Sequence, residues 1–428
     1  MATGRRHTFT GLGRGFISAG LVLTCAGLVL GFADIVRVGV LLVLLAVGAL
    51  LFARRPAPRL EVRRTVNPPT AIPDERAEVE VTFTNIDHRS SRLYLAEERI
   101  DYVLGDRPRF VVAKLEPGAA RQVRYVVRSH LRGRYQLGPV TLTQRDPFGL
   151  THISRALTST DELLVLPRVV PLGSSQPPGS GVGNDGETPQ MIALHGEEDV
   201  SIRTYHDGDD LRKVHWPATA HRGELMVRQE DRPARRSALV LLDSRESAHA
   251  GSGAASSFEW AVSAVASVLV RLEELGYRTQ LVTQEALRTS NAQLMIDRPV
   301  PEMIEDLASV ALGTDADFQQ VLSAALEHVS AGGLAVAVVA AGDDDIPVEL
   351  AGLRQPGAAA LGFVLDPPTF AHGRRGAAEG SEPSEAARRV RDQLATAGWR
   401  VVVVDARLPI AEAWSTVTNK ALVQVGSL

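Results

Sequence analysis

Groups able to move protons or bind metals gather in one stretch of this chain, Asp199–Glu230. Asp209, Asp210 and His215 could act as the acid and base of a hydrolase, because carboxylate and imidazole side chains are common proton-transfer groups. A metal site formed by His206, Asp209, His215 and His221 is a second interpretation, although their spacing fits no established ligand pattern. Either chemistry would require these side chains to converge in a pocket.

Two non-catalytic interpretations explain the same stretch. In one, Asp209 or Asp210 pairs with Arg203 or Arg212 in a network that holds the segment to its neighbours, with His215 and Trp216 buried in the seam. In the other, the segment is a docking surface, since Trp, Tyr and Arg dominate interface hot spots. The two interpretations are compatible, and we favour them over an enzyme or a zinc site.

A second group of oxygen ligands follows the apolar run Ser237–Leu242, at Asp243-Ser244-Arg245-Glu246-Ser247. With Gly313-Thr314-Asp315, it resembles the cation site of von Willebrand factor A-like domains, which use Asp-x-Ser-x-Ser, a Thr and a later Asp. Such oxygen ligands suit Mg²⁺. Asp243, Ser247 and Thr314 match that pattern. Arg245 replaces the first Ser, and Ala341-Gly342 occupies the place of the last Asp, with Asp343 slightly beyond.

The charge of Arg245 decides our expectation for this second group. A guanidinium at the ion position would repel a cation, so we expect a degenerate site in which Arg245 pairs with Asp243 and no cofactor is bound. Binding of Mg²⁺ is the alternative.

The C-terminal region, residues 237–428, alternates buried strands and helices. Strands are predicted at Ser237–Leu242, Thr279–Thr283, Leu334–Ala340, Ala359–Leu365 and Arg400–Val404. Helices are predicted at Phe258–Leu275, Asp317–Val329 and Ser384–Ala397. This order predicts a doubly wound α/β domain with a parallel sheet, whose sites lie at the carboxyl ends of the strands.

Residues 54–172 have the alternation and turn spacing of an antiparallel β-sandwich, clearest at Ala77–Asn85. Two strings in this module, Arg132-Gly133-Arg134-Tyr135 and Asp146-Pro147-Phe148-Gly149-Leu150, are interpreted as turn chemistry, with Phe148 filling the sandwich end. Residues 173–236 contain a Gly/Pro/Ser linker and the charged segment. Gly181–Gly186 of the linker matches G-x-G-x-x-G formally, but it lacks the strand and helix that a dinucleotide site requires.

Residues 1–53 are predicted to form an N-terminal tail and a transmembrane hairpin with helices at 15–33 and 38–53. Arginines flank both ends of the hairpin and only Arg37 lies in its loop, so the positive-inside rule places both termini in the cytoplasm. We therefore expect an inner-membrane protein held in the lipid bilayer. The net charge of −4 argues against a dedicated nucleic-acid binder, and the single Cys25 excludes an intramolecular disulfide.

The charged segment resembles the signature of a bacterial family known as domain of unknown function 58. The resemblance extends to the two strings of the β module and to the overall layout. Here Pro217 and His221 stand where the family has Lys and Arg. The resemblance implies association with MoxR-type AAA+ ATPases and a C-terminal von Willebrand A-like domain. The matching signature residues are Arg203, Tyr205, Gly208, Asp209, Asp210, Arg212, His215, Trp216 and Ala220.

The sequence as a whole predicts a non-enzymatic, membrane-anchored cytoplasmic scaffold that serves as an adaptor for a MoxR-like AAA+ ATPase. A homo-oligomer is compatible with this layout. The alternatives are the hydrolase that uses Asp209, Asp210 and His215, and a metal-dependent adhesion-type binding protein.

Overall fold

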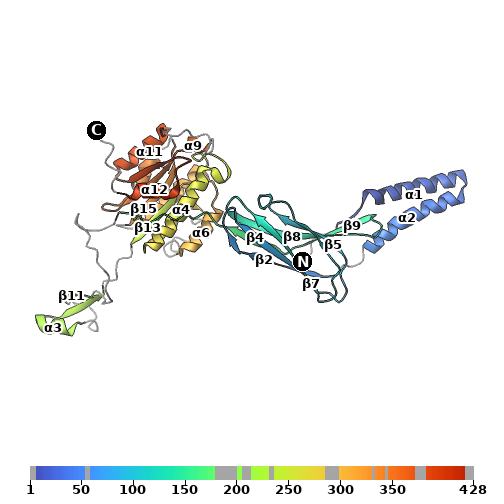
Figure 1. The fold of residues 1–428 in the computed structure, drawn as a ribbon, viewed down its shortest axis with the longest axis horizontal. Helices are drawn as coiled ribbons and strands as arrows, with labels where there is room; N and C mark the ends of the chain where they lie inside the picture. Colours follow the sequence, from blue (N-terminus) through green and yellow to red (C-terminus); the bar gives the residue numbers. More distant parts are fainter. Residues whose placement is uncertain are drawn as a thin grey trace. The chain divides into compact units, whose positions relative to one another are not determined.

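The computed structural model describes residues 6–53, 58–178, 200–204, 214–230, 236–284, 298–329, 333–342, 346–371 and 382–419. The chain forms two compact units. The first comprises Met1–Arg168 together with Pro301–Val310, and the second comprises Val169–Val300 together with Ala311–Leu428. The multidomain organisation, with two N-terminal apolar helices, β-sheets and an α/β region, is confirmed (Figure 1).

Two helices, α1 (Gly11–Leu30) and α2 (Ala33–Ala53), form an N-terminal hairpin that is long and apolar enough to cross a membrane. Small residues lie between them. A Cβ on Gly39 would come within 2.7 Å of the Gly20 carbonyl oxygen, and one on Gly27 within 2.8 Å of the Val36 amide nitrogen. Glycines thus allow the two backbones to approach closely, as small residues do between membrane helices.

The hairpin turn lies earlier in the chain than the sequence suggested. Gly31 ends α1 in a left-handed conformation at φ 74°, a backbone geometry that favours glycine. The predicted loop charges, Asp34 and Arg37, instead lie in the first turns of α2 and form an exposed ion pair at 2.8 Å. The predicted start of the first helix at residue 15 was also late, because Thr10 caps α1 by accepting from the Gly13 amide.

The β module has two sheets that share one hydrophobic core. Val81 and Phe83 of the smaller sheet and Leu137 and Val140 of the larger sheet belong to the same buried cluster. The alternation predicted for Ala77–Asn85 is confirmed in β4 (Arg76–Asn85). The smaller sheet has the order β2-β4-β7, with β2 (Leu60–Asn67) and β7 (Ala120–Arg128). The larger sheet follows the path β1-β9-β8-β10-β3, and β5 pairs with β8 and β6. Its strands are β1 (Arg6–Phe9), β3 (Thr70–Ala71), β5 (Tyr94–Ile100), β6 (Arg109–Val112), β8 (Gly133–Arg145), β9 (Thr151–Leu157) and β10 (Asp161–Val165).

The α/β region of the second unit contains a five-stranded parallel sheet in the order β14-β13-β15-β16-β17. Its predicted strands are confirmed to within one residue at each end. They are β13 (Ser237–Leu242), β14 (Arg278–Val282), β15 (Leu334–Ala340), β16 (Ala360–Leu365) and β17 (Arg400–Val404). Strand order reverses between β13 and β15, the position where open α/β sheets place their sites.

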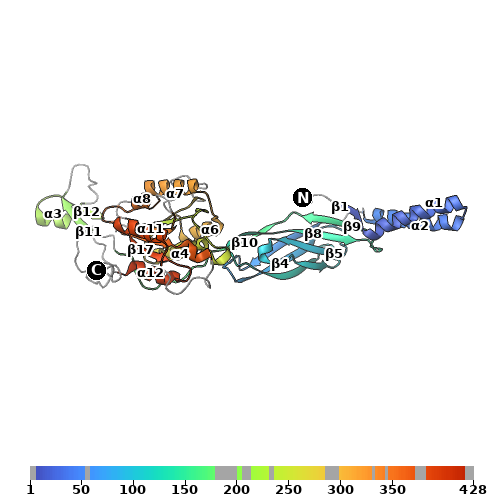
Figure 2. The same ribbon diagram turned by 90° about the horizontal axis from the view of Figure 1, so that it is seen from above.

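Helices cover both faces of this sheet (Figure 2). Residues of α7 (Asp315–His328), α8 (Ile346–Ala351) and α11 (Glu385–Thr396) share a buried cluster with one face of the strands. The other face is covered by α4 (Ser257–Glu274) and α12 (Ile410–Thr418). The unit also contains the short helix α9 (Pro367–Ala371) and a separate two-stranded sheet, β11 (Val200–Thr204) with β12 (Met226–Glu230), between which lies α3 (Trp216–Arg222).

Candidate functional site

A buried ion pair lies where the strand order reverses. Asp243, the first residue after β13, is fully buried, and Arg245 is 2% exposed. The Arg245 Nη2 donates to Asp243 Oδ2 at 2.7 Å, and its Nε donates to Oδ1 at 3.0 Å. The guanidinium therefore donates hydrogen bonds to both carboxylate oxygens, and it also lies 5.2 Å from the centre of the Phe318 ring.

Two backbone amides complete the surroundings of the Asp243 carboxylate. The Arg245 amide donates to Oδ1 at 3.0 Å, and the Ala340 amide at the end of β15 donates to Oδ2 at 3.0 Å. Each oxygen thus accepts two hydrogen bonds, which fills the lone-pair positions that a carboxylate offers. A cation at this position would have to displace the Arg245 guanidinium.

The other two residues of the predicted cation site lie on loops that the structure brings to Asp243. Gly313 bonds to this loop twice, donating to the Ser244 carbonyl at 2.7 Å and accepting from the Glu246 amide at 2.9 Å. Ser247 donates to Asp315 Oδ1 at 2.5 Å. Thr314 caps α7, and its hydroxyl donates to Asp317 Oδ2 at 2.8 Å. The two loops therefore lie side by side, and Asp243, Ser247 and Thr314 each have a protein partner. Asp343 lies outside the described residues.

His249 is a half-buried residue of this site that the sequence analysis did not single out. Its Nε2 donates to the Asp243 backbone carbonyl at 3.0 Å, and its Nδ1 lies 2.9 Å from the Ser257 hydroxyl. Burial lowers the pKa of the His249 imidazole, and the Asp243 charge opposes that effect. Because the Asp243 carboxylate points to Arg245 and Ser257 is fully buried, these three residues do not form a nucleophilic triad.

The signature segment is the charged segment Asp199–Glu230, and its later part contains the short helix α3. His215 caps it, with Nδ1 accepting from the Ala218 amide at 3.2 Å, and Gly223 ends it in a left-handed conformation. The Thr219 hydroxyl accepts from the amide of buried Met226 at 3.0 Å, which ties α3 to β12. The structure thus gives His215 and Thr219 local structural roles.

Trp216, the first residue of α3, is 69% exposed, so the expectation that it is buried in a seam was wrong. Ala220 is also exposed. Arg203 lies in β11, opposite Val227. Tyr205, Gly208, Asp209, Asp210 and Arg212, like His206 and the Gly181–Gly186 string, lie outside the described residues. Among the described residues, no cluster of His, Cys, Asp or Glu could hold a metal ion.

The Arg132-Gly133-Arg134-Tyr135 string does more than form a turn. Arg132 is 8% exposed, and it donates to the carbonyl oxygens of Leu307 at 2.8 Å and Val310 at 2.6 Å. Leu307 lies in the last turn of α6 (Val300–Ser309), where carbonyls lack helical partners, and Val310 is the first residue after the helix. The string therefore caps a helix that is far away in sequence, and this helix is counted within the first unit from Pro301 onward.

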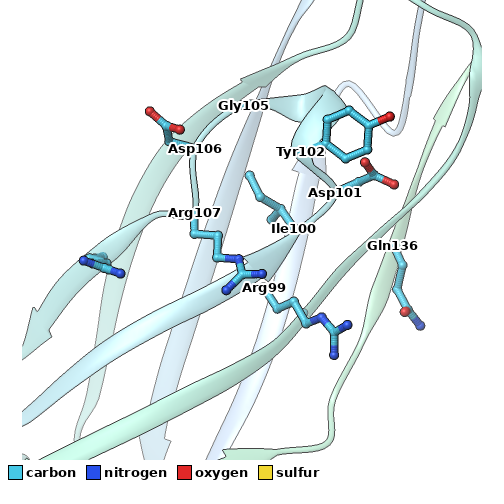
Figure 3. Close-up of a pocket in the computed structure, with 10 residues that line it drawn as sticks. Arg99, Ile100, Asp101, Tyr102, Gly105, Asp106, Arg107 and Gln136 are labelled. Atoms are coloured by element: carbon cyan, nitrogen blue, oxygen red, sulfur yellow. The ribbon is translucent and has the colours of Figure 1, made fainter.

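An open pocket of about 890 Å³ lies on the β module, around the short 3₁₀ helix η1 (Tyr102–Leu104) (Figure 3). The side chains of Arg99 and Arg107 reach across it, and Tyr102 lies at its edge with 89% of its surface exposed. Arg107 and Arg109 both pair with Glu97, at 3.6 and 2.9 Å, so their charges are partly balanced. Asp101 caps η1. The pocket is therefore polar but has no convergent acid–base pair.

Residues 201–339 match the family model described as "Protein of unknown function DUF58". The matched region contains the signature segment and the strands β13 and β14, and it includes β15 as far as Val339. The match supports the resemblance drawn from the sequence. No curated protein matches the chain.

Among solved structures, the chain is similar to the CARDB domain of the PF1109 protein from Pyrococcus furiosus, with 17% identity and a TM-score of 0.20 over 26% of this chain and 90% of that one. It is similar to the alkylpurine DNA glycosylase AlkC of Pseudomonas fluorescens, with 16% identity and a TM-score of 0.18 over 31% of this chain and 39% of that one. The sporulation control protein Spo0M of Bacillus subtilis has 13% identity and a TM-score of 0.15, over 26% of this chain and 49% of that one.

Proposed function

We propose that this chain is a membrane-anchored cytoplasmic scaffold that presents α3 and its flanking strands to a MoxR-type AAA+ ATPase. The exposure of Trp216 carries the proposal. A tryptophan that is 69% exposed is a common hot-spot residue of protein interfaces. Its backbone is held by the caps at His215 and Gly223 and by the bond between Thr219 and Met226, so docking would order little additional chain.

The state of the buried ion pair supports a scaffold over an adhesion-type cation site. Arg245 and two backbone amides occupy the hydrogen-bonding positions of the Asp243 carboxylate. The hydroxyls of Ser247 and Thr314 donate to aspartates of the same loops. In this proposal Arg245 replaces the cation and keeps the two loops in one fixed arrangement without any cofactor.

Arginine placement supports the proposed orientation. Arg5, Arg6 and Arg14 lie before or at the start of α1, and several arginines follow α2. The positive-inside rule then keeps the β module and the second unit on the cytoplasmic side of the inner membrane. Alkaline phosphatase fused after Leu428 should be inactive, because the enzyme requires the periplasm. An active fusion would contradict the orientation.

The direct test is capture of a purified MoxR-type ATPase by the full-length chain in nanodiscs, with ADP or a non-hydrolysable ATP analogue. We expect retention by the wild type and a loss of about thirtyfold in affinity for Trp216→Ala, the effect of removing a hot spot of about 2 kcal/mol. Tyr102→Ala is the matched control, because Tyr102 is an exposed aromatic residue of the other unit. No binding in either nucleotide state, or equal binding by all three proteins, would refute the proposal.

A further inference from the structure

The loop Asp146–Leu150, between β8 and β9, is built to expose one aromatic side chain. The Asp146 carboxylate accepts from the Phe148 amide at 2.8 Å and from the Thr151 hydroxyl at 2.9 Å, which closes the turn. Leu150 is fully buried. The sequence analysis had expected Phe148 to be the covered residue of this loop. Phe148 is instead 60% exposed. A rigid turn that holds a phenylalanine outward suggests a contact beyond the module.

The same loop is bonded to the start of the first membrane-type helix. Thr10, the N-cap of α1, donates its amide to the Leu150 carbonyl at 2.9 Å and its hydroxyl to the Gly149 carbonyl at 2.7 Å. A Cβ on Gly13 would overlap the Leu150 carbonyl oxygen, so the loop lies directly against the first turn of α1. The height of Phe148 along the helix is therefore fixed by these contacts.

That height corresponds to the boundary between water and lipid. The first turn of α1 ends at Arg14, which is exposed, and uncharged residues follow from Gly15. A bilayer that accommodates the apolar part of α1 would place Arg14 among the lipid headgroups. Phe148, beside this turn, would then lie at the level where membrane proteins concentrate aromatic side chains.

A second contact joins the same end of the β module to the last turn of α2. The Arg92 guanidinium lies 4.9 Å from the centre of the Phe52 ring, near the end of α2. Leu93, the next residue, is 64% exposed. Because Leu95 of β5 pairs with Thr143 of β8, Leu93 and the loop after β8 lie at one end of the sheet. This end therefore presents two apolar side chains beside both helices of the hairpin.

We propose that this end of the β module is a membrane-contacting surface, in which Phe148 and Leu93 enter the headgroup region of the bilayer that holds the hairpin. The inference rests on the proposed membrane anchoring. Its occupant is a lipid surface, because the patch is continuous with the two apolar helices through Thr10 and Phe52. The β module would then lie directly on the membrane and would not be connected to it by a flexible linker alone.

The single native cysteine allows a direct test in the full-length chain. In a Cys25→Ala background, Phe148→Cys and Leu93→Cys are labelled with the environment-sensitive dye NBD and reconstituted into phosphatidylcholine/phosphatidylglycerol vesicles. Tyr102→Cys, an exposed site at the opposite end of β5, is the control for solvent, and Leu28→Cys, an exposed site in α1, is the control for membrane insertion. We expect lipids brominated near the headgroup to quench the dye at Phe148 and Leu93 but not at Tyr102.

The controls separate this inference from the anchoring on which it rests. Quenching at Leu28 without quenching at Phe148 and Leu93 would overturn the membrane contact and leave the anchoring intact. Loss of quenching at Leu28 itself would overturn the anchoring. A blue shift at Phe148 that rises with protein density and ignores lipid bromination would show a second copy of the chain on this surface, and would also overturn the proposal.

Discussion

The Arg245 guanidinium contacts both carboxylate oxygens of Asp243, at 2.7 and 3.0 Å, in a position where almost no surface of either residue reaches solvent. A buried carboxylate that is held in this way is neutralised by its own chain. The pair connects the carboxyl ends of β13 and β15, because Arg245 Nη2 also donates to the Ala340 carbonyl at 3.2 Å. Its removal should therefore affect both stability and the affinity of the site for cations.

Arg245→Ser restores the Asp-x-Ser-x-Ser pattern at this pair. We expect the variant to lose about 3–5 kcal/mol of unfolding free energy without metal, since the buried Asp243 charge is left unpaired. Mg²⁺ should recover part of this loss, whereas the wild type should not respond to Mg²⁺. Intrinsic fluorescence can follow the transition, because all four tryptophans lie in the second unit. The double variant Asp243→Asn/Arg245→Ser is the control and should not respond to Mg²⁺. Stabilisation of the wild type by Mg²⁺ would show that Arg245 yields to a cation.

The half-buried His249 predicts a pH dependence for the second unit. Burial lowers the pKa of this imidazole below its ordinary value of 6.5, so below that pH the unfolded chain binds more protons than the folded chain. Stability should be complete above pH 6.5 and should decrease as the pH falls toward the lowered pKa. Denaturant midpoints at about pH 7.5 and about pH 5.5 measure the slope. His249→Gln should reduce that slope, and an unchanged slope would assign it to other groups.

Arg132 should control the local stability of α6. Arg132→Met removes two hydrogen bonds from a charged donor and leaves the Leu307 and Val310 carbonyls without that partner, at a cost of about 2 kcal/mol. We expect faster amide hydrogen exchange in residues 300–310. Arg134→Met is the matched control, because Arg134 is exposed and its hydrogen bond to Ser309 lies at the surface. The loss of stability in this variant should be under about 1 kcal/mol. Equal exchange in the two variants would argue against the cap.

A single methyl group should test the packing of the hairpin. Gly39→Ala places a Cβ within 2.6 Å of the Thr24 amide nitrogen, so the helices must separate, at a cost of about 1–3 kcal/mol. Gly48→Ala serves as the control, because no atom lies within 4 Å of its added Cβ. We expect a lower thermal unfolding midpoint in detergent for Gly39→Ala alone. A similar shift in both variants would indicate an effect of alanine on the helix and not on the contact.

Periodicity was sufficient to predict the strands of the parallel sheet. The apolar runs at Ser237–Leu242 and Leu334–Ala340 became fully covered parallel strands, because both faces of that sheet carry helices. Local charge was a poorer guide to boundaries. Asp34 and Arg37 suggested the hairpin loop, whereas Gly31 ends the helix by its left-handed backbone. The pairing of Arg245 with Asp243 was foreseeable because the two residues are two positions apart in the motif and opposite in charge.

Long-range partners left little trace in the sequence. Arg132 bonds to Leu307, 175 residues later, and no local pattern identifies that carbonyl. Phe148 and Leu150 are similar: both are apolar, and the sequence does not show that Leu150 is the covered one and Phe148 the exposed one. Trp216 was expected to be buried in one of two interpretations, the charge network, whereas the structure leaves it 69% exposed at the start of α3.

The pairing of β1 with β9 has a consequence for the synthesis of the chain. Arg6–Phe9 leaves the ribosome before the hairpin, yet its partners, Thr151–Ser154, follow nearly the whole β module. Both helices are therefore made before β9, and β1 stays unpaired during that time. Only then can β1 join the edge of the larger sheet. For a chain anchored as proposed, membrane insertion and completion of this sheet are ordered events, and a truncated nascent chain that ends before β9 would leave its first strand without a partner.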